Sequence, residues 1–211
     1  MPAPAFSSCH TALLPSISTH PCTVWSAHAG MLAEDLEQVL LRLPSSPATA
    51  VMETDGLITH VVGELYLPGT HQIGPAGRAV ALGIMLGSML RGDYVIADDA
   101  AAWVVLGPPE STSGSFVTAL RPASRRGMRI RHSRDLPPEH VERIGGCPVT
   151  IPVRTATDLL RLAPSYQAIQ TVRAFIASGH LSIPDLSREI QRIRKRPHGT
   201  RALTLLTDLA V

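Results

Sequence analysis

Apolar residues recur near both ends of the chain with the 3.6-residue spacing of amphipathic helices. In residues 31–43 this spacing predicts a helix, which Pro44 ends. Towards the C-terminus it predicts three more helices, over 165–178, 182–195 and 200–209, separated by Gly and Pro residues. The C-terminal part of the chain is therefore expected to be helical.

A shorter pattern follows Pro44. A short helix over 48–53 leads through an Asp-Gly turn into two short strands within 57–68, which form a hairpin. Helix, short helix and hairpin make the outline of a winged helix that lacks one of its three helices, so we predict a partial winged-helix-like module over residues 30–70. The short helix and the hairpin contain no Arg or Lys. DNA-binding proteins usually contact the phosphates with basic side chains, so this module is not expected to bind DNA by itself.

The centre of the chain combines one strongly apolar helix with several short strands. Residues 75–90 are apolar on nearly every face, which predicts a buried helix that begins at a proline. Strands over 94–97 and 115–120 flank a further short helix, in which Trp103 is expected to be a core residue. Residues 71–211 are therefore predicted to form an α/β domain, a small mixed sheet packed with helices and followed by a helical C-terminal part, and the fold class is α+β.

A basic strand comes next. The strand over 115–120 is expected to return through a basic turn into residues 128–132 as a hairpin. Alternation places His132 on the apolar face of the second strand, and Arg129 and Arg131 on the opposite face. Since a lone histidine on an apolar face is more often a hydrogen-bonded core group than a ligand or a base, a structural role is favoured for His132.

Three further signals follow this strand. Residues 138–144 are predicted to form a short helix that a Gly-Gly pair ends. The next segment, 147–153, is predicted to be a buried strand whose two prolines confine it to an edge or an irregular end of the sheet. In the helix after it, Thr155 and Asp158 resemble a capping box, and Arg154 can pair with Asp158. The alternative is that Arg154 and Asp158 face a partner.

Residues 1–29 are rich in Pro, Ser, Thr and Ala and show no sustained period, which predicts a disordered leader. The Cys and His residues of this segment lack the close pairs that zinc sites use, so no metal site is predicted. Three irregularly spaced cysteines in the whole chain make no disulfide framework and fit a reducing cytosol. No signal peptide is evident, and the most hydrophobic run, 76–90, is too short to span a bilayer, so we expect a cytoplasmic protein without membrane contact.

The formal net charge of +2 hides a difference between the two halves of the chain. Residues 1–120 carry a net charge of −7 and residues 121–211 one of +9. This asymmetry indicates an acidic partner, either nucleic acid or an acidic protein surface; the equally weighted alternative is that the arginines only solvate exposed helix faces. The candidate contact residues are Arg121, Arg125, Arg126, Arg129 and Arg131 in a first cluster and Arg188, Arg192, Arg194, Lys195 and Arg196 in a second.

No catalytic constellation and no cofactor motif is evident, so neither a catalytic residue nor a cofactor is predicted. The one feature that favours a metal-dependent nuclease is Asp185 after Pro184, followed by Glu189 and Gln191. These residues lie on a predicted helix and lack the strand context that such nucleases use. A binding protein is therefore preferred to an enzyme.

Four motifs occur in a fixed order: GLITHVVGELYLP over 56–68, AAAWVVLG over 100–107, RIRHSRDLPPEHV over 129–141 and GGCPVTIPVRTATDLL over 145–160. Their order resembles that of antitoxins of the abortive-infection AbiE type, and the likeness covers about residues 50–210. The last two motifs are the most specific, and they contain His132, Arg154, Thr155 and Asp158.

Proteins of this family belong to type IV toxin–antitoxin systems and are widespread in actinobacteria, whose GC-rich genomes fit a chain in which 18 of 19 basic residues are arginine. The resemblance implies a non-enzymatic antitoxin whose C-terminal α/β domain is needed to neutralise a nucleotidyltransferase-like toxin. It also implies a transcriptional regulator whose N-terminal winged helix binds operator DNA. The shortened module here, poor in basic residues, departs from that pattern. The alternative is an orphan protein-interaction module that has lost its toxin and operator.

Overall fold

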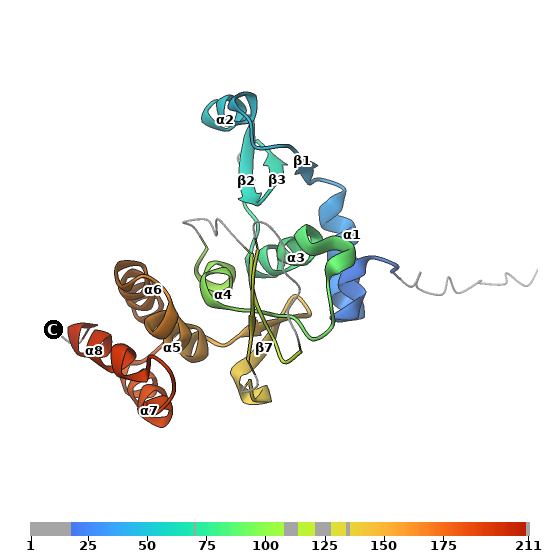
Figure 1. Cartoon of the computed structure of the whole chain (residues 1–211). Coiled ribbons are helices and arrows are strands. Elements are labelled where there is room, and N and C mark those ends of the chain that lie inside the picture. Colours follow the sequence, from blue (N-terminus) through green and yellow to red (C-terminus); the bar gives the residue numbers. More distant parts are fainter. Residues whose placement is uncertain (1–17, 70, 108–113, 121–127, 134–135, 210–211) are drawn as a thin grey trace, which may run out of the picture.

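The computed structural model describes residues 18–69, 71–107, 114–120, 128–133 and 136–209. In these residues the fold is α+β, as predicted: eight α-helices accompany one three-stranded and one five-stranded sheet. Figure 1 shows a small N-terminal module, a central sheet with its helices, and a C-terminal helical bundle as three neighbouring parts.

The N-terminal module contains the three-stranded sheet. Its elements are the 3-10 helix η1 (Pro21–Val24), α1 (Ala27–Glu37), β1 (Leu41–Arg42), α2 (Pro47–Thr54), β2 (Ile58–Val62) and β3 (Leu65–Pro68). The strands pair antiparallel in the order β1-β3-β2. The predicted short helix and hairpin are confirmed. The first helix ends earlier than predicted, because the residues after it form β1 and pair with β3.

Residues 18–29 belong to the folded core, so the predicted disordered leader is wrong for this part; residues 1–17 lie outside the described residues. Cys22 is completely buried and Trp25 is 5% exposed. The indole Nε1 of Trp25 donates a hydrogen bond to the carbonyl oxygen of Tyr94 at 2.9 Å. Composition was misleading here because a single 3-10 turn with two buried side chains is too short to show a hydrophobic period.

The central part is built around the five-stranded sheet. Its elements are α3 (Pro75–Leu86), η2 (Gly87–Met89), β4 (Val95–Ile96), α4 (Asp98–Leu106), β5 (Gly114–Thr118), β6 (Met128–His132), η3 (Pro138–His140), β7 (Val141–Ile144) and β8 (Cys147–Thr150). The strand order is β6-β5-β4-β8-β7. Sheet residues such as Ile96 and Phe116 form the main core with α1, α3 and α4. The predicted buried helix is confirmed, and so is Trp103 as a core residue.

β5 and β6 run parallel, so the hairpin predicted between these two strands is wrong. In the observed register Val117 lies beside Arg131, and Thr118 lies beside His132. Alternation in a sequence determines which side chains share a face of a strand, but it leaves the direction of the neighbouring strand open.

β7 and β8 form an antiparallel hairpin joined by Gly145 and Gly146. Their φ angles of 58° and 79° are those that a two-residue hairpin turn requires, and a Cβ on Gly145 would lie 2.9 Å from the Cβ of Ala76. The helix predicted over 138–144 is confirmed only for the 3-10 helix η3, Pro138–His140; residues 141–144 form β7, because the Gly-Gly pair makes a turn between strands. The edge position predicted for 147–153 is also wrong, since β8 lies between β4 and β7.

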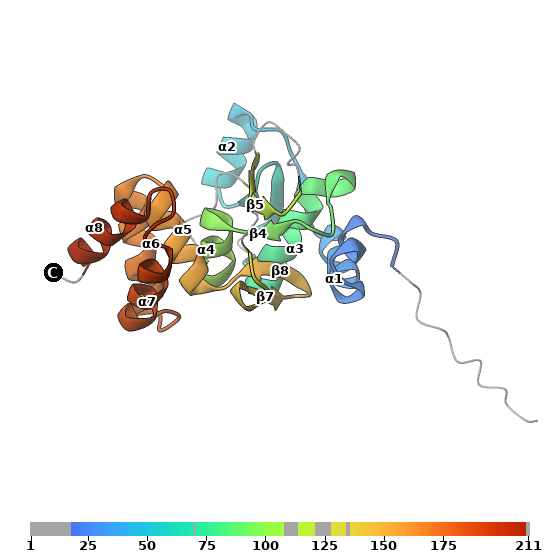
Figure 2. The same ribbon diagram turned by 60° about the horizontal axis from the view of Figure 1, so that its bottom comes forward.

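The C-terminal bundle consists of α5 (Pro152–Leu162), α6 (Ser165–Ala177), α7 (Ile183–Ile193) and α8 (Gly199–Leu209), and it has a core of its own. Figures 1 and 2 both show it beside α4, at the other side of the molecule from α1. The last three helices match the prediction. The predicted capping box is wrong: α5 begins with Ile151 as its N-cap and without a side-chain cap, and Thr155 Oγ1 donates to the carbonyl oxygen of Thr150 at 3.0 Å.

Trp25→Ala tests whether the segment before α1 is part of the core. We expect the free energy of unfolding to fall by about 3–5 kcal/mol, because a large buried side chain leaves a cavity. Val24→Ala is the matched control, since Val24 is half exposed, and we expect a change within about 0.5 kcal/mol. Urea denaturation of both variants measures the difference; similar small changes would contradict the core position of Trp25.

Candidate functional site

Arg131 lies between two buried carboxylates where the central part meets the C-terminal bundle. Its Nη2 donates to Asp98 Oδ1 and to Asp158 Oδ2, both at 2.9 Å. The side chains of Asp98 and Asp158 are 4% and 3% exposed, and that of Arg131 is 24% exposed. One guanidinium therefore ties β6 to the first residue of α4 and to the middle of α5.

Asp158 is the centre of this cluster. Besides Arg131, it accepts hydrogen bonds from Arg154 Nε at 2.8 Å and from Arg161 Nη1 at 3.0 Å. Burial by itself would raise the pKa of Asp158, but the ion pairs with Arg131 and Arg154 outweigh it and hold this pKa below its ordinary value. The predicted Arg154–Asp158 pair is confirmed, and both side chains are buried inside the chain. We call Asp98, Arg131, Arg154, Asp158 and Arg161 the buried ion-pair cluster.

Asp98 is the less favourable carboxylate of the cluster. Burial raises its pKa, and the attraction of Arg131 only partly offsets this effect. Its backbone has a φ of 53°, in the left-handed region that favours glycine. Next to it, Asp99 accepts hydrogen bonds from Ser115 Oγ and, at 3.2 Å, from Arg129 Nη2. The cluster thus holds a strained and desolvated residue in place at the start of α4.

His140 extends the cluster towards α7. Its Nδ1 lies 3.3 Å from Arg154 Nη1, and its Nε2 lies 3.0 Å from Arg192 Nη2 and 3.7 Å from Glu189 Oε1. Burial lowers the pKa of His140; Glu189 opposes this shift, while the cations of Arg154 and Arg192 add to it. A neutral imidazole has one acceptor nitrogen, so only one of the two arginines can donate to it at a time. No local sequence pattern signals this contact, because the partners of His140 are 14 and 52 residues away.

The arginines of the first predicted cluster do not form one free surface. Arg131 is engaged in the buried ion-pair cluster, and Arg129 pairs with Asp98 and Asp99 while keeping half of its side chain exposed. Arg121, Arg125 and Arg126 lie outside the described residues. His132 is exposed, and its Nε2 lies 3.2 Å from the carbonyl oxygen of Ala119, so its predicted core position is wrong.

The second predicted cluster lies together on α7 and just after it. Arg188, Arg192, Arg194, Lys195 and Arg196 are all exposed, and we call them the α7 basic surface. Arg188 pairs with Asp185, and Arg192 pairs with Glu189.

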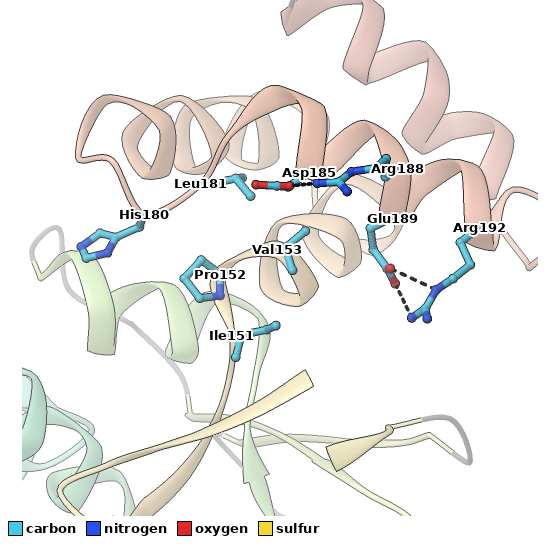
Figure 3. Close-up of a pocket in the computed structure, with 9 residues that line it drawn as sticks. All are labelled: Ile151, Pro152, Val153, His180, Leu181, Asp185, Arg188, Glu189 and Arg192. Carbon is cyan, nitrogen blue, oxygen red and sulfur yellow. Dashed lines mark hydrogen bonds and ion pairs between the residues drawn. The ribbon is translucent and has the colours of Figure 1, made fainter. Parts of the chain in front are cut away.

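A cleft of about 470 Å³ opens beside Arg188 and Arg192 (Figure 3). It lies between the start of α5 and α7, and its lining residues are Ile151, Pro152, Val153, His180, Leu181, Asp185, Arg188, Glu189 and Arg192. Figure 3 shows Arg188 and Arg192 on the same side of α7, each directed towards the carboxylate with which it pairs. The cleft therefore combines an apolar wall with charged groups of both signs.

Asp185, the residue considered for a nuclease, is exposed on α7 and hydrogen bonded to Ser182 and Arg188. Within the described ranges, no group of three or more His, Cys, Asp or Glu side chains is arranged to hold a metal ion, and no helix is long and apolar enough to cross a bilayer. No protein-family model and no curated protein matches the chain.

Arg131→Met tests the buried ion-pair cluster. It leaves two buried carboxylates without their shared cation, so we expect the free energy of unfolding to fall by about 3–5 kcal/mol. Arg129→Met, at a half-exposed ion pair on the same strand, is expected to cost less than about 1 kcal/mol. Adding Asp98→Asn to Arg131→Met should restore part of the lost free energy of unfolding. Urea denaturation of all three variants measures these changes. Equal losses in Arg131→Met and Arg129→Met would contradict the role of Arg131 in the buried ion-pair cluster.

The pKa of His140 predicts a pH dependence of stability. Because this pKa is lower in the folded chain, the unfolded chain binds the proton more readily, and the free energy of unfolding should fall as the pH drops below about 6.5. His140→Gln should flatten this slope between about pH 7 and about pH 5.5. Urea denaturation midpoints measured at each pH give the slope, and a slope that persists in His140→Gln would contradict the assignment to His140.

Proposed function

We propose that this chain is a non-enzymatic, antitoxin-like protein of a type IV toxin–antitoxin system that works in the cytoplasm. It neutralises a nucleotidyltransferase-like toxin and contacts operator DNA to regulate its own operon. The observation that carries the proposal is the α7 basic surface, which stands exposed on the C-terminal bundle. The resemblance of the motifs over residues 129–160 to AbiE-type antitoxins supports the same function.

The α7 basic surface suits an acidic partner. Arginine binds phosphates and carboxylates with two parallel hydrogen bonds, and it stays charged at every physiological pH. Arg194 and Lys195 form no side-chain hydrogen bond or ion pair with any described residue, so both cations are available to a partner. The ion pair of Arg188 with Asp185 lies at the surface, where exchange for a partner's acidic group costs little. Arg192 is half exposed, but its partner Glu189 is largely buried.

The N-terminal module is a poor candidate for DNA contact. Residues 18–69 contain six acidic residues and a single basic one, Arg42, which pairs with Glu37 at 2.9 Å. An acidic module repels a phosphate backbone. In this proposal operator DNA is therefore contacted by the C-terminal half, and the partial winged-helix-like module serves another purpose.

The residues of the family-like motifs lie beneath the α7 basic surface and contact the helices that carry it. Arg154 and Asp158 pair with each other, and Thr155 bonds to Thr150 at the end of β8. Arg154 also reaches His140, which contacts Arg192 on α7. In the proposed function these residues orient the bundle, and the partner contacts are made by the outward-facing cations.

The proposal is tested first by the neighbouring gene. We expect it to encode a nucleotidyltransferase-like protein that arrests growth, and we expect co-expression of this chain to restore growth. The purified chain should also bind DNA from upstream of its own gene, with an affinity that falls as salt rises. Absence of rescue together with absence of DNA binding would contradict the proposal and favour an orphan interaction module.

A triple variant locates the DNA-binding surface. Arg188→Ala, Arg194→Ala and Lys195→Ala together should reduce the slope of log K against log salt by about 0.9 for each phosphate that is no longer neutralised, about 2.7 in total. Arg192 is left unchanged because it contacts His140. The double variant Arg42→Ala with Arg173→Ala is the control, because it removes two exposed arginines outside the α7 basic surface. An unchanged slope in the triple variant would instead indicate that residues 121–134 contact the DNA.

A further inference from the structure

A second pocket, of about 80 Å³, lies between the β2–β3 hairpin and the helices α3 and α4. Figures 1 and 2 both show the hairpin next to α3. The apolar wall of the pocket is formed by Val61, Leu67, Ile73 and Trp103. Arg78 is the one arginine or lysine among the described residues that line it, and none of these residues is acidic. The lining of this pocket therefore carries a net positive charge.

Arg78 is partly buried and bonds to backbone carbonyl groups. Its Nε and Nη2 donate to the carbonyl oxygen of Val104 at 3.2 and 3.0 Å, and its Nη1 donates to that of Ile73 at 2.8 Å. These bonds use three of the five N–H groups of a guanidinium, so one N–H remains on Nη1 and one on Nη2. Within the described part of the chain, no carboxylate pairs with Arg78. The pocket thus contains a cation that the described residues leave without a counterion.

The bonds to carbonyl groups explain why Arg78 is held in place, but they do not explain its charge. Val104 lies in the last turn of α4, whose carbonyl oxygens lack partners within the helix. A neutral amide can donate to the same oxygens. A desolvated positive charge is unfavourable without a counterion, and burial accordingly lowers the pKa of Arg78. An anion in the pocket removes this cost.

The position of the pocket in the fold favours an anion as well. Residues 71–73 line the pocket and lead directly into α3, a helix of 12 residues. The N-terminal end of such a helix carries a partial positive charge, which adds to the charge of Arg78. The exposed Gln72 forms no side-chain hydrogen bond with another described residue, so its amide is available to a ligand.

The size and the lining of the pocket determine the class of anion. A cavity of about 150 Å³ takes up benzene, so a pocket of about 80 Å³ takes a smaller molecule. Two N–H groups with one positive charge match the two oxygens of one carboxylate, and the apolar wall matches a short alkyl chain. We propose that the pocket binds a small aliphatic monocarboxylate, with its carboxylate on Arg78 and its alkyl chain against Leu67 and Trp103.

The bound carboxylate contacts β2 and β3 on one side and α3 and α4 on the other. It therefore ties the N-terminal module to the central part and favours one orientation of the hairpin on α3. So small a molecule makes few contacts, which places its affinity in the millimolar range. The site does not depend on the proposed antitoxin function.

The two tryptophans of the chain give the test an internal control, because Trp103 lines the pocket and Trp25 does not. The indole N–H signals of the ¹⁵N-labelled full chain are followed by NMR during titration with sodium propionate at constant ionic strength, and Trp103→Phe assigns them. We expect a saturable shift of the Trp103 signal and no shift of the Trp25 signal. Propionamide, which has the same shape without the charge, should bind at least tenfold more weakly. Inorganic phosphate, which has no alkyl chain, should also bind at least tenfold more weakly.

A matched pair of variants separates the site from general electrostatics. Gln72→Glu changes an exposed side chain, so the fold should be unaffected. We expect it to weaken propionate binding at least tenfold, because the new carboxylate pairs with Arg78 and repels the ligand. Gln167→Glu makes the same chemical change at an exposed position on α6 and should leave binding unchanged.

Arg78→Gln should also lose propionate binding, and its circular dichroism spectrum shows whether the variant is folded. The proposal is overturned by a Trp103 signal that does not shift, by equal shifts of both indole signals, or by propionamide or phosphate binding as tightly as propionate. Unchanged propionate binding in Gln72→Glu overturns it as well.

Discussion

The arrangement of the molecule depends on one guanidinium shared by two buried carboxylates. Arg131 reaches Asp98 at the start of α4 and Asp158 in α5, where the central core and the core of the bundle adjoin. Hydrophobic contacts such as those of Ala102 also join the two parts, but they are non-directional. A buried ion pair adds little net stability, since desolvation opposes it, yet it accepts few alternative geometries. The cluster therefore acts mainly on the orientation of the bundle.

Arginines that look alike in the sequence differ in burial and in their contacts. Arg154 is buried and Arg131 is partly buried, and both fix one element against another, whereas Arg194 and Lys195 are exposed at the end of α7. His140 lies between the two groups and links Arg154 to Arg192. In the positive half of the chain, some arginines thus hold elements together and others lie exposed on the surface.

Much of the fold followed from local pattern. The buried helix α3, the β2–β3 hairpin and the helices after residue 165 were predictable because apolar periodicity and Gly or Pro boundaries are local properties. The strand direction of β6 and the interior position of β8 were not, because both depend on partners far along the chain. The Arg154–Asp158 pair was predictable from its i,i+4 spacing. The role of His140 was not, since only the folded chain brings Glu189 and Arg192 to it.

The segment before α1 has a further consequence for the order of folding. Trp25 is covered from several distant parts of the chain: its indole bonds to Tyr94, and its carbonyl oxygen accepts a hydrogen bond from Arg143, 118 residues later, at 2.8 Å. During synthesis the N-terminal segment emerges from the ribosome long before Arg143 does. The carbonyl oxygen of Trp25 therefore lacks its hydrogen bond from Arg143 until the β7–β8 hairpin has been made. The segment before α1 thus completes its native contacts only after most of the five-stranded sheet has been made.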